Sequence, residues 1–283
     1  MNVQATIANI VDALKGVDGV NAVVLGGSRA RGTESPSSDI DIGIYYDSEK
    51  GLDMARLRQV AASLDDDRKD GLITEIGGWG PWINGGGWLK VNGTPVDFLL
   101  RDQNKVSQVI ERCVAGDITV DYQPGHPHGF VNSIYLAEIA LCKALWDPSG
   151  VVSNLKSRTI PYPPVYQKAV IGKFFWEAAF SLENGYKGIY KNDLSYIAGC
   201  CFRSSSCLNQ VLFAANESYL MNEKGATAIV DTFNLAPIDY ADRINELFSL
   251  ISEDQDGLKK ALGMMRDLIR ETESILVSEG LSN

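Results

Sequence analysis

The spacing of hydrophobic and polar positions differs between the two halves of the chain. Before about residue 150 it switches repeatedly between a helical period and the two-residue period of a strand. This half predicts helices over 3–14, 53–64, 103–115 and 132–146 and strands over 22–25, 39–46, 79–83, 86–91 and 95–100. Beyond it the period is helical, predicting helices over 166–183, 194–220, 240–252 and 257–277. We therefore expect an α/β (α+β) domain with a mixed sheet, followed by an all-helical domain.

Turn-forming residues mark where these elements meet. Asn84-Gly85 and Asn92-Gly93 are strong hairpin dipeptides, so the strands around them are expected to form an antiparallel meander. Prolines and glycines then interrupt the segment 148–164, where no regular helix is expected. We place the domain boundary there, giving domains over 1–150 and 151–283.

Charge and composition narrow the class of protein. The 283 residues are 45% hydrophobic, and 26 Lys and Arg against 36 Asp and Glu give a net charge of −10. There is no basic run, so long nucleic acid and anionic membrane are not expected partners. No signal peptide or membrane span is recognised in the sequence, and five cysteines without a C-x-x-C pair favour reduced thiols. A soluble, cytoplasmic protein is expected, with His126 and His128 exposed in a loop.

The candidate chemistry lies in two short segments of the first domain. Gly27-Ser28 is followed, after a gap of ten residues, by Asp39-Ile40-Asp41. Residues two apart on a strand share a face, so the two aspartates point together and their charges repel. A cation between them relieves that repulsion, and carboxylates without nearby His or Cys favour Mg²⁺ or Mn²⁺.

A third carboxylate, Asp97, lies in an otherwise apolar predicted strand. It is either a third metal ligand or the partner of Arg101 in an ion pair. Three carboxylates from two strands could hold two ions about 3.5–4 Å apart, as in phosphoryl-type displacement. Gly27 lets the backbone approach a phosphate closely, and Arg31 is either a phosphate ligand or an ordinary surface charge.

In combination these motifs resemble the nucleotidyltransferase superfamily of DNA polymerase beta, kanamycin nucleotidyltransferase and the aminoglycoside adenylyltransferases. Leu25-Gly26-Gly27-Ser28, Asp39-Ile40-Asp41 and Asp97 fit the family pattern over roughly residues 22–100. The resemblance implies a catalytic domain over 1–150 and a helical substrate domain over 151–283. It also implies that Gly27 and Ser28 hold a nucleoside triphosphate, that Asp39 and Asp41 bind the metals, and that Asp97 completes the site or acts as base.

Two further candidates stay open at this stage. Glu75 is either a second candidate for the general base, beside Asp97, or a solvent-facing residue. Lys224 is either a phosphate-binding point charge or part of a solvated helix tail.

The expected reaction is metal-dependent transfer of a nucleoside monophosphate, AMP from ATP, to a hydroxyl of a small molecule, with release of pyrophosphate. A protein side chain is the alternative acceptor, as in AMP-transferring and antitoxin-type members of the superfamily. The alternative from another class is a non-catalytic nucleotide-binding module.

Overall fold

The structure is a computed structural model that describes residues 3–282. The chain divides into two compact units. One comprises the chain up to Glu111 together with Tyr135–Pro161, and the other comprises Arg112–Ile134 and the chain from Tyr162 onward.

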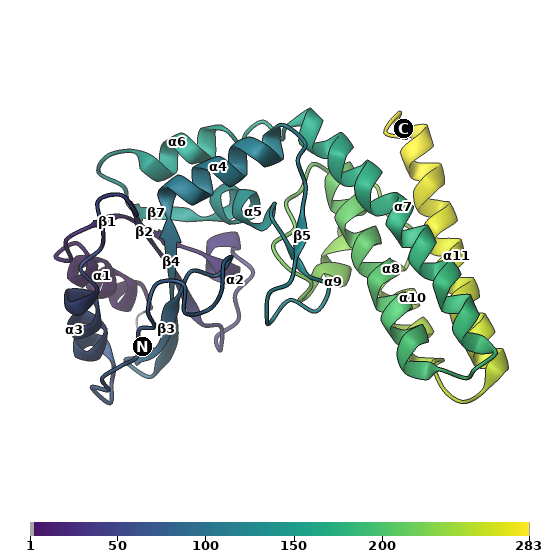
Figure 1. Cartoon of the computed structure of the whole chain (residues 1–283), viewed down its shortest axis with the longest axis horizontal. Helices are drawn as coiled ribbons and strands as arrows, with labels where there is room; N and C mark the ends of the chain where they lie inside the picture. Colours follow the sequence, from purple (N-terminus) through teal and green to yellow (C-terminus); the bar gives the residue numbers. More distant parts are fainter. Residues whose placement is uncertain (1–2, 283) are drawn as a thin grey trace. The chain divides into compact units, whose positions relative to one another are not determined.

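The first unit is built on a five-stranded mixed sheet (Figure 1). Its strands are β1 (Val20–Leu25), β2 (Ile40–Tyr46), β3 (Gly86–Val91), β4 (Thr94–Asp102) and β7 (Lys143–Trp146), in the order β3-β4-β2-β1-β7. The central pair β2 and β4 is parallel, whereas the other neighbours are antiparallel. Because the central pair is parallel, β2 and β4 begin at the same edge of the sheet.

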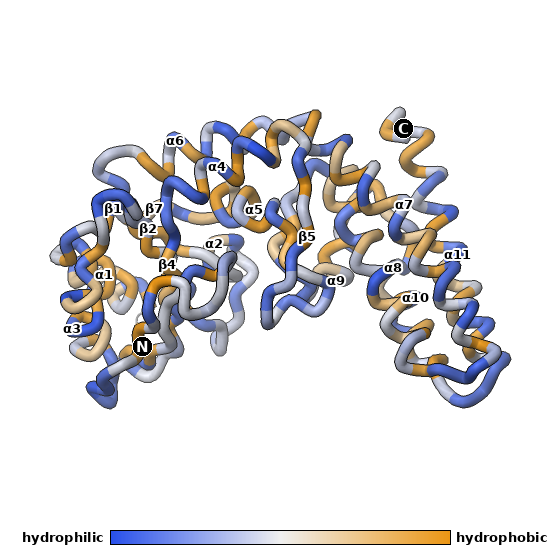
Figure 2. Tube along the Cα trace, in the orientation of Figure 1, coloured by the Kyte–Doolittle hydropathy of each residue, from blue (hydrophilic) through white to orange (hydrophobic). Residues whose placement is uncertain are grey.

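Six helices belong wholly or mostly to this unit. They are α1 (Val3–Leu14), α2 (Gly27–Arg31), α3 (Met54–Leu64), α4 (Gln103–Val114), α5 (Ile134–Leu141) and α6 (Val151–Ser157). The apolar faces of α1 and α3 pack against one face of the sheet, where Ile40, Ile42 and Phe98 are fully buried. Figure 2 shows the resulting concentration of hydrophobic residues along the central strands. By strand alternation, residues next to these positions lie on the opposite face.

The second unit is mainly helical. It contains the two-stranded pair β5 (Val120–Asp121) and β6 (Phe130–Val131) and the helices α7 (Pro164–Ile189), α8 (Leu194–Ala215), α9 (Ala226–Val230), α10 (Tyr240–Ser249) and α11 (Gln255–Ser278). The long helices α7 and α8 pack along each other, and Gly185 lets them approach because a Cβ there would lie 3.3 Å from Cys200 Cβ and 3.2 Å from Leu262. None of the helices in the described residues is long and apolar enough to cross a membrane.

The structure confirms the expected fold class, but it corrects three local predictions. Residues 79–83 form turns and bends, so the meander is reduced to the hairpin of β3 and β4 around Asn92-Gly93. The helix predicted over 132–146 ends at Leu141, because the chain then pairs with the free edge of β1 as β7. The segment 148–164 contains the short helix α6 before its second group of prolines.

The two compact units also differ from the predicted domains. Residues 112–134 group with the helices, and the chain changes unit after Pro161. The division into functional domains over 1–150 and 151–283 stays a prediction.

Candidate functional site

Strand register places two of the predicted carboxylates next to each other. In the parallel pair of β2 and β4, Asp41 is the direct partner of Asp97. Both residues alternate with fully buried ones, Ile40 and Ile42 on β2 and Val96 and Phe98 on β4, whose side chains face α1 and α3. The two aspartates therefore lie together on the other face of the sheet, near its edge.

The local environment changes the acidity of Asp97. Partial burial, followed by the charges of Asp41 and then Asp39, raises its pKa to about 6. The order of these causes indicates a desolvated carboxyl with like charges nearby. All three predicted carboxylates thus interact electrostatically, and a cation placed among them would relieve the repulsion.

Arg101 does not neutralise Asp97. Its guanidinium is buried and donates two hydrogen bonds to Glu138 of α5, at 2.7 and 2.6 Å. Within the described residues Asp97 has no ion-pair partner. The alternative of a structural Asp97–Arg101 ion pair is therefore wrong.

The turn after β1 brings the backbone against Asp41. The Gly26 N–H donates to the Asp41 carbonyl oxygen at 2.8 Å, which joins the turn to β2. Gly27 has φ +60°, and a Cβ there would overlap Asp41 Oδ2. Only glycine adopts this positive φ without strain and leaves room for the Asp41 carboxylate. A glycine at position 27 therefore allows the turn and the carboxylate to stay in contact. Ser28 follows as the second residue of α2 and is half-buried.

Arg29 stabilises the backbone that carries Asp39. Its guanidinium donates to the carbonyl oxygens of Asp39 at 2.9 Å and of Ser38 at 2.5 Å. Asp39 precedes β2 and is exposed, whereas Asp41 lies within the strand and is half-buried. Arg31 is exposed in the last turn of α2.

The other two predicted site residues, Glu75 and Lys224, come from other segments of the chain. Glu75 pairs with Arg58 of α3 at 2.6 Å, and its side chain is 77% exposed. The pair ties the Glu75 carboxylate to α3, which packs on the opposite face of the sheet from the two aspartates. Lys224 belongs to the second unit, where it is exposed between α8 and α9 and its backbone N–H donates to Asn222 Oδ1.

Lys143, a cationic residue near the glycine turn, was not predicted from the sequence as a site residue. Lys143 begins β7 as the register partner of Leu25, the residue just before the glycine pair. Its ammonium donates to the Arg29 carbonyl oxygen at 3.4 Å, so it lies beside α2. Lys143 was missed because residues 132–146 have a helical period, and only pairing with β1 brings this lysine to the turn.

The three aspartates supply part of the ligand set of a divalent cation. Among residues 3–282, no group of three or more His, Cys, Asp or Glu side chains is close enough to form a complete metal site. Mg²⁺ does not require such a group, since it commonly uses one or two carboxylates and completes its shell with water and substrate phosphates. Asp41 and Asp97, with Asp39 nearby, supply hard oxygen ligands of that kind.

Comparison with known proteins identifies this part of the chain. Residues 6–114 match the family model of the nucleotidyltransferase domain, and that range contains the glycine turn and all three aspartates. A crystal structure of a nucleotidyltransferase-like protein from Exiguobacterium sibiricum 255-15 superposes with a TM-score of 0.45 at 8% identity, covering 96% of this chain and 77% of that chain. No curated protein matches the sequence. Residues 6–114 thus form a nucleotidyltransferase domain within the chain.

Proposed function

We propose that the protein transfers AMP from ATP to a hydroxyl group of a small molecule in a Mg²⁺-dependent reaction that releases pyrophosphate. The observation that carries this proposal is the pairing of Asp41 with Asp97 across two parallel strands, directly against the Gly27 turn. Carboxylates beside a backbone turn suit a metal-bound triphosphate better than they suit an anion alone. Mn²⁺ fits the same ligands.

Each residue has a defined part in this reaction. Asp39, Asp41 and Asp97 would hold the divalent cation, which neutralises phosphate charge when bound. Gly27 and Ser28 hold the triphosphate by close backbone approach, with Lys143 and Arg31 adding positive charge from β7 and α2. Glu75 has weaker support, since its exposed side chain is paired with Arg58 of α3, and Lys224 of the second unit stays a candidate phosphate ligand.

Asp97 is the preferred general base. A neighbouring cation would keep this carboxylate ionised and able to accept a proton. The acceptor's hydroxyl oxygen attacks the α-phosphorus and gives its proton to the Asp97 carboxylate, while the bond from the α-phosphorus to the bridging oxygen breaks and pyrophosphate leaves. The exposed Glu75, held by Arg58, is less suited to this role.

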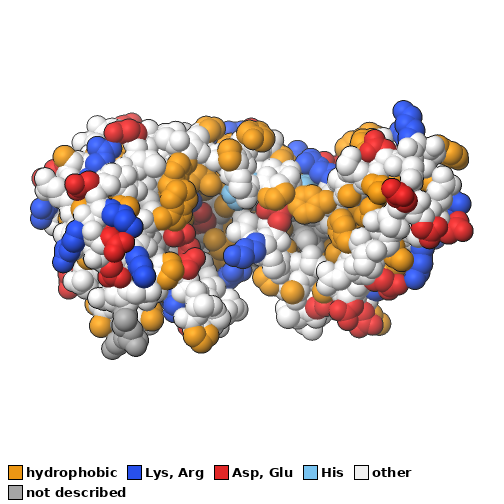
Figure 3. Space-filling model, turned by 90° about the horizontal axis from the view of Figure 1, so that it is seen from below, with side chains coloured by type: hydrophobic (Ala, Val, Ile, Leu, Met, Phe, Trp, Pro, Cys, Tyr) orange, Lys and Arg blue, Asp and Glu red, His pale blue; other side chains and the backbone are white. Residues whose placement is uncertain are grey.

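Charge supports a small-molecule acceptor over nucleic acid. The chain carries −10, and Lys and Arg side chains are scattered among acidic ones on the face that Figure 3 shows. A nucleic-acid acceptor normally requires a basic track. The five free cysteines favour a reducing, cytoplasmic location.

The experiment uses ATP labelled at the α-phosphate, Mg²⁺ and a library of hydroxyl compounds. We expect the label to move to an acceptor with one pyrophosphate released per transfer, and Asp41→Asn to abolish this. Asp12→Asn is the matched control, because Asp12 is an exposed acid on α1 of the same unit, paired with Lys15. Label transfer to protein would replace the small-molecule acceptor with a side chain. ATP binding without pyrophosphate release across the library would instead favour a non-catalytic module.

A further inference from the structure

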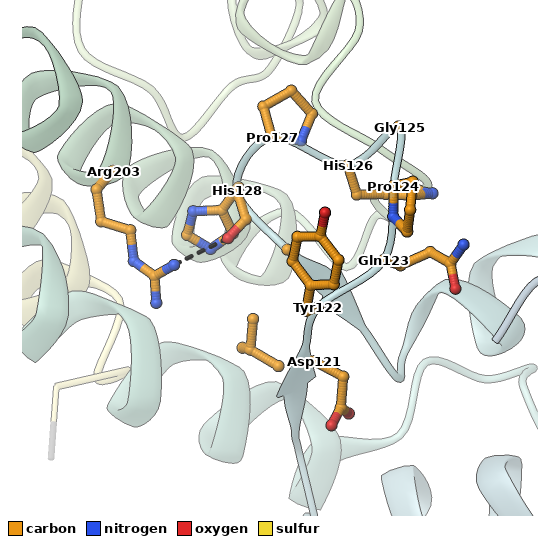
Figure 4. Close-up of a pocket in the computed structure, with 11 residues that line it drawn as sticks. Asp121, Tyr122, Gln123, Pro124, Gly125, His126, Pro127, His128 and Arg203 are labelled. Carbon is orange, nitrogen blue, oxygen red and sulfur yellow. Dashed lines mark hydrogen bonds between the residues drawn. The ribbon is translucent and has the colours of Figure 1, made fainter. Parts of the chain in front are cut away.

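A polar pocket of about 580 Å³ in the helical unit does not expose the buried histidine beside it. It is formed by the loop between β5 and β6, residues 120–129, together with Arg203 of α8 (Figure 4). The sequence predicted an exposed His128 in this loop, but His128 is only 6% exposed. Both of its ring nitrogens are buried, and the ring lies against Phe174 with 6.1 Å between centroids. This pocket therefore presents a ligand mainly with exposed loop surface.

An exposed tryptophan of the sheet unit lies beside the aspartates. Trp88 of β3 is the register partner of Asp97 on β4, which is in turn the partner of Asp41 on β2. Leu89, the residue after Trp88, belongs to the core on the other face of the sheet. By strand alternation, Trp88, Asp97 and Asp41 form one row across the aspartate face, with neighbouring strands about 4.8 Å apart. The indole is thus next to the carboxylate proposed as the general base.

A second tryptophan supports the ring of Trp88. The Trp79 and Trp88 rings are stacked, with 4.6 Å between centroids and 29° between planes. Trp79 lies close to Gly86, where a Cβ would come within 2.9 Å of its ring. Trp88 nevertheless remains 65% exposed, so the side of the indole away from Trp79 is open to solvent. One face of the ring is held by the protein and the other can receive a ligand.

The loop that carries Trp79 is fixed by hydrogen bonds within the sheet unit. The Tyr135 hydroxyl of α5 donates to the carbonyl oxygen of Trp82, and the Asn84 side-chain amide donates to the Tyr46 hydroxyl of β2. These bonds join the loop both to a helix and to a central strand of the sheet. The aromatic pair is therefore in place before a ligand arrives, which lowers the entropy cost of binding.

The order of the strands indicates which reactant the Trp88 ring meets. Asp41 has the turn at Gly27 on its β1 side and Asp97 on its β4 side, and Trp88 lies beyond Asp97 on β3. In the reaction proposed above, a triphosphate held at the turn directs its leaving pyrophosphate toward β1. In-line displacement places the attacking oxygen opposite the leaving group. The acceptor would therefore approach over Asp97, from the side where the indole lies.

We propose that the open face of Trp88 binds the ring of the acceptor, so that the acceptor is an alcohol whose hydroxyl group is carried on or next to a ring. This inference rests on the proposed function, because the direction of approach follows from nucleotidyl transfer. An indole is a flat apolar surface that stacks on aromatic rings and on the C–H face of saturated rings. A rigid ring also loses less conformational freedom there than an open chain of similar composition.

The test follows the indole N–H groups by NMR in protein saturated with Mg²⁺ and a non-hydrolysable ATP analogue. The chain has five tryptophans, so ¹⁵N labelling gives five indole signals, assigned with single Trp→Phe variants. Two pairs of alcohols are titrated to about 50 mM, which covers millimolar dissociation constants. Myo-inositol is paired with mannitol, and benzyl alcohol with n-pentanol. Within each pair the number of hydroxyl groups is equal, and only the first compound has a ring.

We expect at least one of the two ring compounds to bind about 3- to 10-fold more tightly at the Trp88 signal than its open-chain partner. The pair that responds distinguishes a saturated from an aromatic acceptor ring. Trp176 is the internal control, because it is 64% exposed and stacked on Phe180 but belongs to the helical unit. Its signal should show no such preference for a ring.

Two substitutions at Trp88 make the test specific. Trp88→Leu keeps an apolar side chain without the ring, and we expect about 3- to 10-fold weaker binding of the ring compound, with the affinity for the ATP analogue within about 2-fold of wild type. Trp88→Phe retains an aromatic face and should restore most of the binding. Trp176→Leu is the matched control and should bind the ring compound as wild type does.

Equal responses to the ring and open-chain compounds in both pairs, or unchanged ring binding in Trp88→Leu, would overturn the proposal. Calorimetry of the ATP analogue and of inorganic tripolyphosphate, each with Mg²⁺, separates the other outcomes. Weaker analogue binding in Trp88→Leu with unchanged tripolyphosphate binding would assign the ring to the nucleobase and overturn its role with the acceptor. Failure of the wild type to bind the analogue with Mg²⁺ would contradict the proposed function itself, and this assignment with it.

Discussion

The two units hold their polar groups by different means. In the sheet unit, Asp41 and Asp97 are aligned by the parallel register of β2 and β4, so the backbone ladder sets their spacing. In the helical unit, His128 is placed by hydrogen bonds from a loop to Glu223 and Arg203, which come from distant parts of the chain. A site set by strand register can be read from residue spacing, whereas a site set by side-chain bonds cannot.

Asp97→Asn is expected to lower kcat by about 100- to 10,000-fold, because it removes both the proposed base and one metal-binding charge with little change in volume. Glu75→Gln is the comparison, and we expect its kcat to stay within about 3-fold of wild type, since Glu75 is exposed and paired with Arg58. Steady-state kinetics with an acceptor from the label-transfer screen measures both. A silent Glu75→Gln enzyme beside an active Asp97→Asn enzyme would move the base to Glu75.

Glu138→Gln tests the buried Arg101–Glu138 ion pair of the sheet unit. Arg101 and Glu138 have side chains only 4% and 19% exposed, so loss of the carboxylate leaves a buried cation and is expected to cost about 3–5 kcal/mol of unfolding free energy. The corresponding pair in the helical unit, Arg243–Glu271, is 24% and 43% exposed, and Glu271→Gln should cost less than about 1 kcal/mol. Urea unfolding of the full chain compares them. Equal losses would mean that burial does not distinguish the two pairs.

Gly27→Ala is expected to weaken nucleotide binding by about 10- to 100-fold, because the new Cβ overlaps Asp41 and the backbone is strained. Gly32→Ala is a closely matched control: Gly32 also has positive φ, at +73°, but a Cβ there meets nothing within 4 Å. It reports the cost of the backbone conformation alone. Equal affinities in the two variants, measured by calorimetry, would show that contact with Asp41 has no role in binding.

His128 should make the helical unit less stable in acid. Its folded pKa of about 4 lies below the usual 6.5, so below pH 6.5 the unfolded chain binds a proton that the folded chain does not. This contribution is absent above pH 6.5 and should cost about 1–2 kcal/mol by pH 5. Arg203, Glu177 and Glu223 surround the loop and are the charges that modulate it. Urea unfolding at pH 7 and pH 5 should show a smaller difference in His128→Gln, and an unchanged difference would assign the pH dependence elsewhere.

Local patterns predicted the elements that carry the aspartates. The alternation over 39–46 matches β2 to within one residue, and the long helices of the second half were found because their apolar spacing persists for many turns. Elements fixed by non-local pairing were missed. Residues 143–146 have a helical period but pair with the open edge of β1, and α2 has only five residues, too few for a period to be recognised.

The same limit applies to the sites. The Asp-x-Asp spacing and the lone Asp97 in an apolar strand predicted a carboxylate site, and the strand register brings Asp41 and Asp97 together because strand alternation is a local property. The Arg58–Glu75 pair and the burial of His128 depend on which distant segments fold against them. No spacing rule along the chain contains that information.

The most direct test of the central claim is calorimetric titration of a non-hydrolysable ATP analogue into the wild-type protein and Asp41→Asn, each with Mg²⁺ and with excess EDTA. We expect wild type to bind the analogue only with Mg²⁺, and Asp41→Asn to lose most of this metal-dependent affinity while its circular dichroism spectrum is unchanged. Binding that is equally strong in EDTA, or equally strong in folded Asp41→Asn with Mg²⁺, would contradict the assignment of Asp41 and Asp97 to a metal-bound nucleotide.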